Sequence, residues 1–267
     1  MVSGALSRGL TVIEVLVGAA RGLSLQQVSE RVDLPKSAAH RILANLIEDG
    51  FVRQDTTTGD YVLTLRIVSM ALRHLAENTV VDLARPVLDR LAETSGELVR
   101  LSLVDADSLI WVAKAQGARS GLRYDPDAGV GALLSCSASG LAWLSQYSDE
   151  RALELMLRQG LADPAKYGPQ APTTIEDYLG RLRQARETGY STVFDTFEAG
   201  AAAMAAPILR HAGGGVVGVL SITGPSVRLT AERMAELAGP LTQAAAELSG
   251  VSMEASPELR PTVTATR

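Results

Sequence analysis

The 267-residue sequence is poor in cysteine, with Cys136 alone, and has no apolar run that approaches the roughly 20 residues of a membrane span. A single cysteine excludes an internal disulfide framework and is typical of a protein in a reducing compartment. The chain also has no charged and then apolar leader. We therefore expect a cytoplasmic protein without a membrane partner.

The motifs of common enzyme classes are missing as well. There is no P-loop, no Gly-x-Gly-x-x-Gly fingerprint and no Gly-x-Ser-x-Gly nucleophile elbow. None of the three histidines (His40, His74 and His211) has a cysteine or a second histidine at metal-ligand spacing. No histidine is placed by sequence to activate Cys136 as a nucleophile. We expect no catalytic residues, no metal site and no cofactor.

Positive charge is in the minority, with 25 Lys and Arg against 30 Asp and Glu, a net charge of -5. Taken alone, this balance argues against a nucleic-acid binder, because phosphate contacts require basic side chains. The placement of the charges matters more than their sum. Hydrophobic residues make up 46% and charged residues 21% of the chain, which is typical of folded globular proteins. The length suits one or two domains.

The first part of the chain contains three helical patterns followed by a hairpin pattern. Apolar residues at three-to-four-residue spacing predict helices over 7–20, 24–33 and 36–49. The first helix should carry an apolar face made of Leu10, Ile13, Val17 and Ala20. FVRQ and YVLT flank DTTTGD, which predicts a hairpin with Gly59 in its turn. Residues 1–64 therefore predict a winged helix-turn-helix, mainly α with a β-wing.

The third predicted helix has an outward face that is polar and basic, with no acid between Asp33 and Glu48. A recognition helix enters the major groove with its N-terminal residues. We expect Arg41 to pair with a guanine edge and Asn45 to read adenine. We expect the side chains and amides at the start of this helix to bind phosphate, and the wing to bind phosphate as well. The predicted DNA-binding residues are Lys36, Ser37, Ala38, His40, Arg41, Asn45 and Arg53.

Alternatives stay open at this point. A polar helix face is often only solvated, and winged helices also serve as protein-interaction modules; an enzyme fused to a winged helix is a further possibility. Residues 1–64 carry six basic and seven acidic side chains, so this unit is close to neutral. Because one such module makes few phosphate contacts, we expect a dimer on a two-fold operator. The helix at 7–20 has more apolar surface than one small core needs.

Beyond the wing, helical and strand patterns mix. Helices are predicted over the linker 65–78, over 80–95, within 137–188, and over 230–248. LVRLSLV, SLIWVAKA, YSTVFD, MAAPILR and VVGVLSITG read as strands of a largely antiparallel sheet, so this domain is α+β. We assign it residues 79–250. The polar segment 251–267 is predicted to be a disordered tail.

The chain resembles the IclR family of bacterial transcriptional regulators. The resemblance lies in the ordered words GLSLQQVSERVDLPKSAAHRILANLIEDGFV, TTGDYVLTLR, DLARPVLDRLAETSGE, RETGY, AAPI and LSITGPSVRLT, which run between residues 6 and 249. It implies a GAF-like effector domain with a six-stranded antiparallel sheet. It also implies dimers built through the first and linker helices, often tetramers. The function implied is a repressor or activator of a catabolic operon that binds double-stranded operator DNA and responds to a small organic ligand.

The segment GALLSCSASGLAWL (131–144) predicts a loop that enters a helix, where Ser137 or Ser139 could cap the helix or its amides could hold an anion. The resemblance puts this segment at the family's ligand loop, with Ser135 in place of a common His. Ser221 and Thr223 alternate on one strand face and match positions that line the family's effector cavity. Ordinary capping and sheet hydrogen bonding are the alternatives for these residues.

Two departures from the family make the expected cavity less polar: Val193 and Phe194 stand where many members have acids, and Ala203-Met204 stand where several have a cysteine. We therefore expect an effector that is a small carboxylic acid with an apolar body, either aromatic or aliphatic. Arg123 is a second candidate anion partner, and Trp111 and Tyr124 are candidates for stacking on a ring. The predicted effector-binding residues are Ser135, Ser137, Ala138, Ser139, Val193, Asp195, Glu198, Ala203, Ser221 and Thr223.

Overall fold

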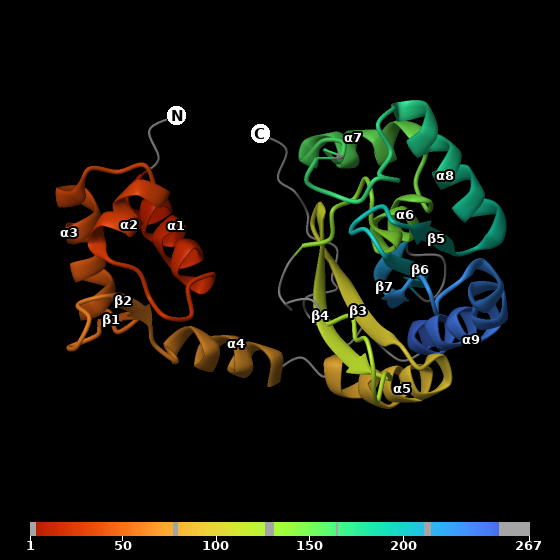
Figure 1. Cartoon of the computed structure of the whole chain (residues 1–267), viewed down its shortest axis with the longest axis horizontal. Helices are drawn as coiled ribbons and strands as arrows, with labels where there is room; N and C mark the ends of the chain where they lie inside the picture. The colour runs from red at the N-terminus through yellow and green to blue at the C-terminus, as the bar shows by residue number, and fades with distance from the viewer. Residues whose placement is uncertain (1–3, 77–79, 126–130, 164, 211–214, 251–267) are drawn as a thin grey trace. The chain divides into compact units, whose positions relative to one another are not determined.

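The computed structural model describes residues 4–76, 80–125, 131–163, 165–210 and 215–250. The chain divides into two compact units, Met1–Glu77 and Asn78–Arg267, which are treated separately (Figure 1). Within the described ranges, no helix is long and apolar enough to span a membrane. The predicted tail, 251–267, lies outside the described residues.

The N-terminal unit is a winged helix-turn-helix, which confirms the predicted fold. Its elements are α1 (Ala5–Val17), α2 (Leu25–Arg31), α3 (Lys36–Glu48), β1 (Val52–Gln54), β2 (Tyr61–Leu63) and α4 (Arg66–Ala76). The two short strands are antiparallel, with Arg53 opposite Val62. The linker helix α4 clusters with this unit. The wing and the third helix therefore belong to one compact body.

Local signals fix the start of α2 and α3. Ser24 and Gln27 form a capping box, in which the Ser24 hydroxyl accepts from the Gln27 amide and the Gln27 side chain accepts from the Ser24 amide. Asp33 has a positive φ of 49° in the turn between the helices. Pro35 then leads into α3 at a φ of -56°, which suits a helix start. The turn thus sets the direction in which α3 leaves α2.

The first helix is present, but its core-facing stripe differs from the apolar stripe that the sequence spacing picks out. Val12 and Leu16 are 0% and 2% exposed, whereas Leu10 and Val17 are 53% and 65% exposed. The helix carries two apolar stripes, and spacing alone does not say which one faces the core. The remaining buried apolar members of this core are Leu23, Val28, Leu43, Val52 and Tyr61.

The C-terminal unit is α+β, as predicted. Its elements are α5 (Val80–Ser95), β3 (Leu98–Asp105), β4 (Ser108–Gln116), α6 (Ala138–Leu144), α7 (Asp149–Gln159), α8 (Ile175–Thr188), β5 (Ser191–Phe194), β6 (Ala201–Leu209), β7 (Val216–Pro225) and α9 (Ala231–Gly250). The strands form one antiparallel sheet in the order β4-β3-β7-β6-β5.

The sheet of the described residues has five strands, one fewer than the six that the family resemblance implies. Next to β4, the chain contributes a single bridge between Ile110 and Gly131. Among the described residues, this bridge is the pairing that the outer edge of β4 makes.

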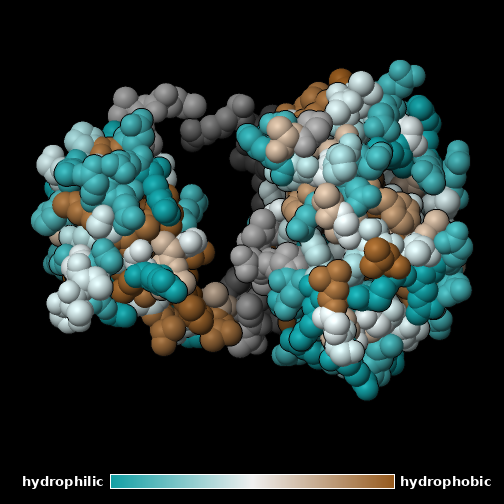
Figure 2. All heavy atoms as spheres, in the orientation of Figure 1, coloured by the Kyte–Doolittle hydropathy of each residue, from teal (hydrophilic) through white to brown (hydrophobic). Residues whose placement is uncertain are grey.

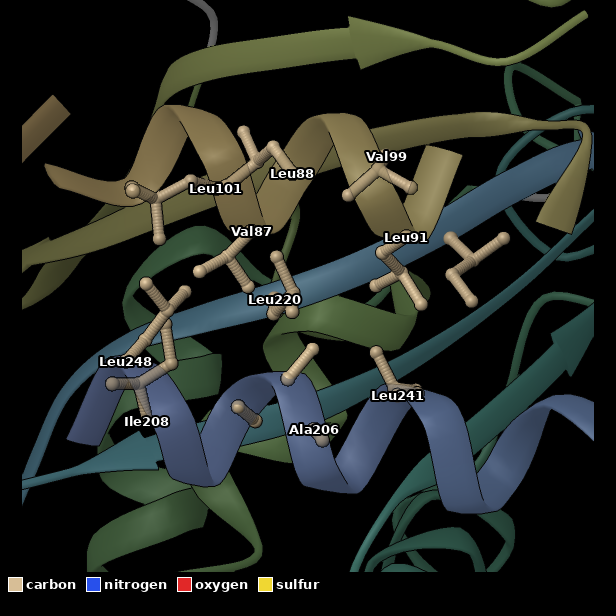
Figure 3. Close-up of a cluster of buried hydrophobic side chains, with 14 of the residues drawn as sticks. Val87, Leu88, Leu91, Val99, Leu101, Ala206, Ile208, Leu220, Leu241 and Leu248 are labelled. Atoms are coloured by element: carbon tan, nitrogen blue, oxygen red, sulfur yellow. The ribbon is translucent and has the colours of Figure 1, made fainter. Parts of the chain in front are cut away.

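Helices cover both faces of the sheet. On one face, α5 and α9 pack through Leu88, Leu91, Leu241 and Leu248 against strand residues such as Leu220 (Figure 3). On the other face, α6 lies against the strands with α7 and α8 beside it, in a second apolar cluster. Burial on both faces explains why most positions of β3 and all of β7 are inaccessible.

Candidate functional site

The outward stripe of α3 carries the residues that the sequence predicts to read DNA. Ser37, Arg41 and Asn45 follow one another at four-residue spacing and are exposed. Lys36 and His40 are exposed beside this stripe, and Ala38 is half-buried. The opposite side of the helix is anchored by buried Ala39 and Leu43. Arg53, on β1, is exposed and lies 3.9 Å from Asp55. Within the described residues, Lys36 and Arg41 have no acidic ion-pair partner.

The wing that follows α3 is held by a compact turn. The Asp55 carboxylate accepts hydrogen bonds from the amides of Thr58 and Thr57, at 3.0 and 2.8 Å. These bonds hold the pKa of Asp55 below its usual value. Gly59, predicted in the turn, has a φ of +79°. The turn thus has a defined shape beside the exposed Arg53.

A hollow of about 760 Å³ lies within the N-terminal unit between α1, α3 and α4. Its walls are mostly apolar, and Leu10, Met70 and Leu6 on them are 53%, 47% and 78% exposed. Figure 2 shows apolar residues gathered over α4. Arg41 and Asn45 stand at the border of this hollow. The predicted dimer surface and the predicted DNA surface are therefore neighbours.

The C-terminal unit has a cavity of about 30 Å³ on the sheet face that α6 covers. All five strands of the sheet, the start of α6 and the loop after β5 contribute to its wall. The lining residues are Arg100, Trp111, Tyr124, Ser137, Ala138, Ser139, Val193, Thr196, Phe197, Ala201, Ala202, Ala203, Ser221 and Thr223. Seven of the predicted effector residues are brought together there: Ser137, Ala138, Ser139, Val193, Ala203, Ser221 and Thr223.

Three predicted effector residues lie outside this lining. Ser135 is fully buried, and its hydroxyl has no hydrogen-bond partner. Asp195 has a φ of +51° and accepts from the Gly200 amide at 2.6 Å, so its carboxylate closes a turn. Glu198 is exposed and lies close enough to the Tyr124 phenol to raise the pKa of that phenol. Glu198 thus touches a residue that lines the cavity without lining it.

Ser137 acts as the N-cap of α6. Its hydroxyl accepts from the Gly140 amide at 3.0 Å and donates to the Leu133 carbonyl at 2.7 Å. Its own amide also donates to the Leu133 carbonyl, at 3.1 Å. The helix that follows has only seven residues. Because the helix is short, its dipole is small and this terminus is a weak anion site.

Arg100, which is not among the residues predicted from the sequence, reaches the cavity from β3. Arg100 is 9% exposed, and its guanidinium carbon lies 4.1 Å from the centre of the Trp111 ring. One terminal nitrogen donates to the Thr223 hydroxyl at 3.4 Å, while Nε has no hydrogen-bond partner. Burial lowers the pKa of Arg100 to about 10, so the side chain stays cationic at neutral pH. Arg123, the second candidate anion partner from the sequence, is exposed and does not line the cavity.

Aromatic side chains form much of the remaining wall. The Trp111 and Phe197 rings meet edge to face, with centres 6.4 Å apart, and Tyr167 lies behind Phe197 at 5.7 Å. Burial raises the pKa of the Tyr124 phenol, so it is a neutral donor at physiological pH. The cavity therefore combines one cation, several hydroxyls and an aromatic and aliphatic surface.

A helix-turn-helix unit joined to an α+β unit with a buried polar cavity is the architecture of a ligand-responsive transcriptional regulator. Residues 72–250 match the C-terminal domain of the bacterial transcriptional regulator IclR, and residues 5–56 match the IclR helix-turn-helix domain. The chain belongs to the IclR family of bacterial transcriptional regulators, as the resemblance in its sequence indicated.

Similar named proteins are transcriptional regulators, and the matches cover most of their length. The HTH-type transcriptional regulator BhcR of Paracoccus denitrificans is 29% identical over 260 residues, which is 92% of this chain and 86% of that protein. The acetate operon repressor of Salmonella typhimurium is 28% identical over 246 residues, which is 91% of this chain and 88% of that protein.

Solved structures share the fold of the whole chain. An IclR transcriptional regulator from Alicyclobacillus acidocaldarius has a TM-score of 0.78 at 25% identity, covering 92% of this chain and 97% of that one. An IclR homologue from Microbacterium hydrocarbonoxydans, solved in complex with 4-hydroxybenzoate, has a TM-score of 0.74 at 23% identity, covering 95% and 100%.

Proposed function

We propose that this regulator binds operator DNA through α3 and the wing, and that a small carboxylic acid in the cavity of the C-terminal unit releases or reshapes that binding. The observation that carries the DNA-binding part is the exposed stripe Ser37, Arg41 and Asn45 beside the unpaired Lys36. The planar Arg41 guanidinium can donate two hydrogen bonds to a guanine edge. Lys36, at the start of the helix, can contact a phosphate.

We propose further that the DNA-binding form is a dimer or a dimer of dimers built partly on α1 and α4. Leu6, Leu10 and Met70 are exposed apolar side chains on these two helices, and exposed apolar patches of this kind commonly mark protein interfaces. A single recognition helix supplies few phosphate contacts, so a second copy adds the avidity that one nearly neutral unit lacks. Such a regulator works in the cytoplasm, where its operator is.

An enzymatic role for this chain has little chemical support. Burial raises the pKa of the Cys136 thiol to about 12, so this cysteine is not a thiolate at neutral pH. Cys136 lies among Ala162 and Ala171 in a small apolar cluster and does not line the cavity. The family to which the chain belongs is one of transcriptional regulators.

The experiment for DNA binding is a mobility shift on the DNA upstream of the protein's own gene. The parent protein should shift this fragment at a concentration that leaves unrelated DNA free. Arg41→Ala should weaken this preference, and Arg21→Ala, which changes an exposed arginine outside α3, should retain it. An Arg41→Ala variant that binds the fragment like the parent contradicts the assignment of α3.

The experiment for effector control adds small carboxylic acids to the same protein–DNA mixture. An acid that binds the cavity should change the mobility shift and raise the thermal midpoint of the protein by mass action. 4-Hydroxybenzoate belongs in the panel beside shorter aliphatic acids. Both effects should vanish in the double variant Ser221→Ala with Thr223→Val. Responses only to cations or sugars contradict a carboxylic-acid effector.

A further inference from the structure

The C-terminal unit has two buried charged side chains, and only one of them has an ion-pair partner among the described residues. Glu97 is 5% exposed and is held by the Arg228 guanidinium through two hydrogen bonds, at 2.7 and 2.8 Å. Arg100 lies three residues further along the chain and is 9% exposed. Among the described residues, no carboxylate pairs with Arg100. One buried charge is thus neutralised within the protein and the other is not.

A buried cation without an anion is costly, and proteins normally neutralise it or remove it. The contacts that Arg100 does make are weak substitutes. The Thr223 hydroxyl lies at 3.4 Å, near the limit of a hydrogen bond, and the Trp111 ring supplies a cation–π contact. Nε has no hydrogen-bond partner. The guanidinium therefore has donor capacity left beside a cavity that it lines.

The charges of the lining define what the cavity accepts. Arg100 is the single ionised side chain among the lining residues at neutral pH, because the other members are apolar, hydroxyl-bearing or aromatic. One carboxylate would neutralise it through the planar pairing that arginine favours. A second carboxylate on the same ligand would stay buried without a partner.

We propose that Arg100 is the specificity-determining residue of the effector cavity and that it selects compact monocarboxylates over their neutral amides and over dicarboxylates. The proposal rests on the proposed function, since it needs the cavity to be the effector site. The carboxylate pairs with the free side of the guanidinium, and the Thr223 hydroxyl is within reach as a further donor. The ligand body packs against Phe197 and Ala203.

The test measures binding of matched probes to the full-length protein by tryptophan fluorescence, since Trp111 lines the cavity. Benzoate is compared with benzamide and phthalate, and butyrate with butyramide and succinate. We expect at least one monocarboxylate to bind, with its amide and its diacid weaker by about 10- to 100-fold, the usual effect of losing a charged hydrogen bond. Equal binding of acid and amide overturns the proposal.

Three variants separate charge from packing. Arg100→Met should bind the monocarboxylate about 10- to 100-fold more weakly and bind acid and amide alike. Arg100→Lys should keep the preference for acid over amide at reduced affinity, because the charge remains but the planar fork is lost. Arg123→Met, which changes an exposed arginine outside the lining, should behave like the parent. An Arg100→Met variant that keeps the preference for acid overturns the proposal.

A fourth variant distinguishes failure of this proposal from failure of the effector site. Ala203→Val adds two methyl groups to the wall of a cavity of about 30 Å³ and should abolish binding. Loss of binding in Ala203→Val together with unchanged selectivity in Arg100→Met means that the cavity is the site but Arg100 does not select the ligand. Binding that survives Ala203→Val, or no binding by any acid of the panel, contradicts the effector cavity and the proposal together.

Discussion

The two units of this regulator hold their polar chemistry in opposite environments. In the N-terminal unit, Lys36, Arg41 and Asn45 stand in solvent on a helix whose other side is apolar. In the C-terminal unit, Arg100 and Thr223 are buried between two helical layers. Charge on the first surface costs little to maintain and acts on a partner that brings its own dense charge. A charge buried in the C-terminal unit is costly to maintain. Its presence is therefore the stronger indication that a ligand binds there.

The largest effect that we expect concerns the paired buried charge. Arg228→Ala leaves Glu97, which is 5% exposed, without its cation. Loss of one partner of a buried pair destabilises by about 3 to 5 kcal/mol, and we expect about 3 here because Arg228 is partly solvated. Urea unfolding measures the change. Arg90→Ala, which breaks the exposed pair with Glu247, should cost less than about 1 kcal/mol. Equal costs for both variants would remove the contrast between buried and surface charge.

Substitutions on the exposed face of α3 should change the affinity for DNA. Arg41→Ala should cost about 1 to 3 kcal/mol on operator DNA and relax base preference at one position in each half-site. Lys36→Ala should weaken binding to all sequences and lower the slope of affinity against salt by about one unit. Fluorescence anisotropy over a salt series separates the two. If Arg41→Ala also weakens all sequences alike, the guanidinium contacts phosphate instead of a base.

The unpaired buried charge should show an effect of opposite sign. Without ligand, Arg100→Met should raise the free energy of unfolding by about 1 to 3 kcal/mol, because it removes a buried cation that has no anion. Burial lowers the pKa of Arg100 to about 10 from 12.5. The penalty is therefore present below about pH 10 and is relieved as pH rises through that value. The stability gap between parent and variant should narrow in alkaline buffer. A variant less stable than the parent at pH 7 would mean that the Trp111 contact outweighs the cost of burial.

The smallest effect tests a neutral polar group of the N-terminal unit. Ser24→Ala removes one half of the capping box at the start of α2 and should cost about 1 kcal/mol. Thermal unfolding followed by circular dichroism gives the change. Ser24→Asp, which can accept the same amide hydrogen bond, should restore most of it. Equal losses in both variants would argue against the cap as the cause.

Sequence patterns were a good guide where one face of an element meets solvent. The predicted helices 36–49 and 80–95 correspond to Lys36–Glu48 and Val80–Ser95, and the hairpin around Gly59 is present. In each case, the spacing of the apolar residues and the residues at the turns predict the same structure. The stripe on α3 was predictable for the same reason, because exposed polar positions repeat with the helix.

The rest depended on which neighbours pack against a segment. Both stripes of α1 are apolar, so only tertiary packing decides that Val12 and not Leu10 enters the core. Arg100 sits in LVRLSLV, a strand covered on both faces, where alternation carries no signal. A single arginine within such a strand was itself a usable signal, since it has no route to solvent unless the strand lies at an edge. Asp195 and Glu198 follow β5 in a turn, and their directions depend on its backbone.

The pairing of β3 with β4 contains one irregularity. Leu101 is opposite Ala113, but Ser102 is opposite Trp111, so Val112 is an extra residue in β4. Leu109 and Trp111 consequently pack on the side of α6, whereas Ala113 and Ala115 pack toward α5 and α9, although all four have odd numbers. The odd-numbered side chains of β4 therefore point to one face of the sheet before Val112 and to the other face after it. Before the break, Trp111 lines the cavity and Leu109 packs in the apolar cluster beside it; after the break, small alanines leave room for α5 and α9. A single extra residue thus allows one edge strand to contribute to two different cores.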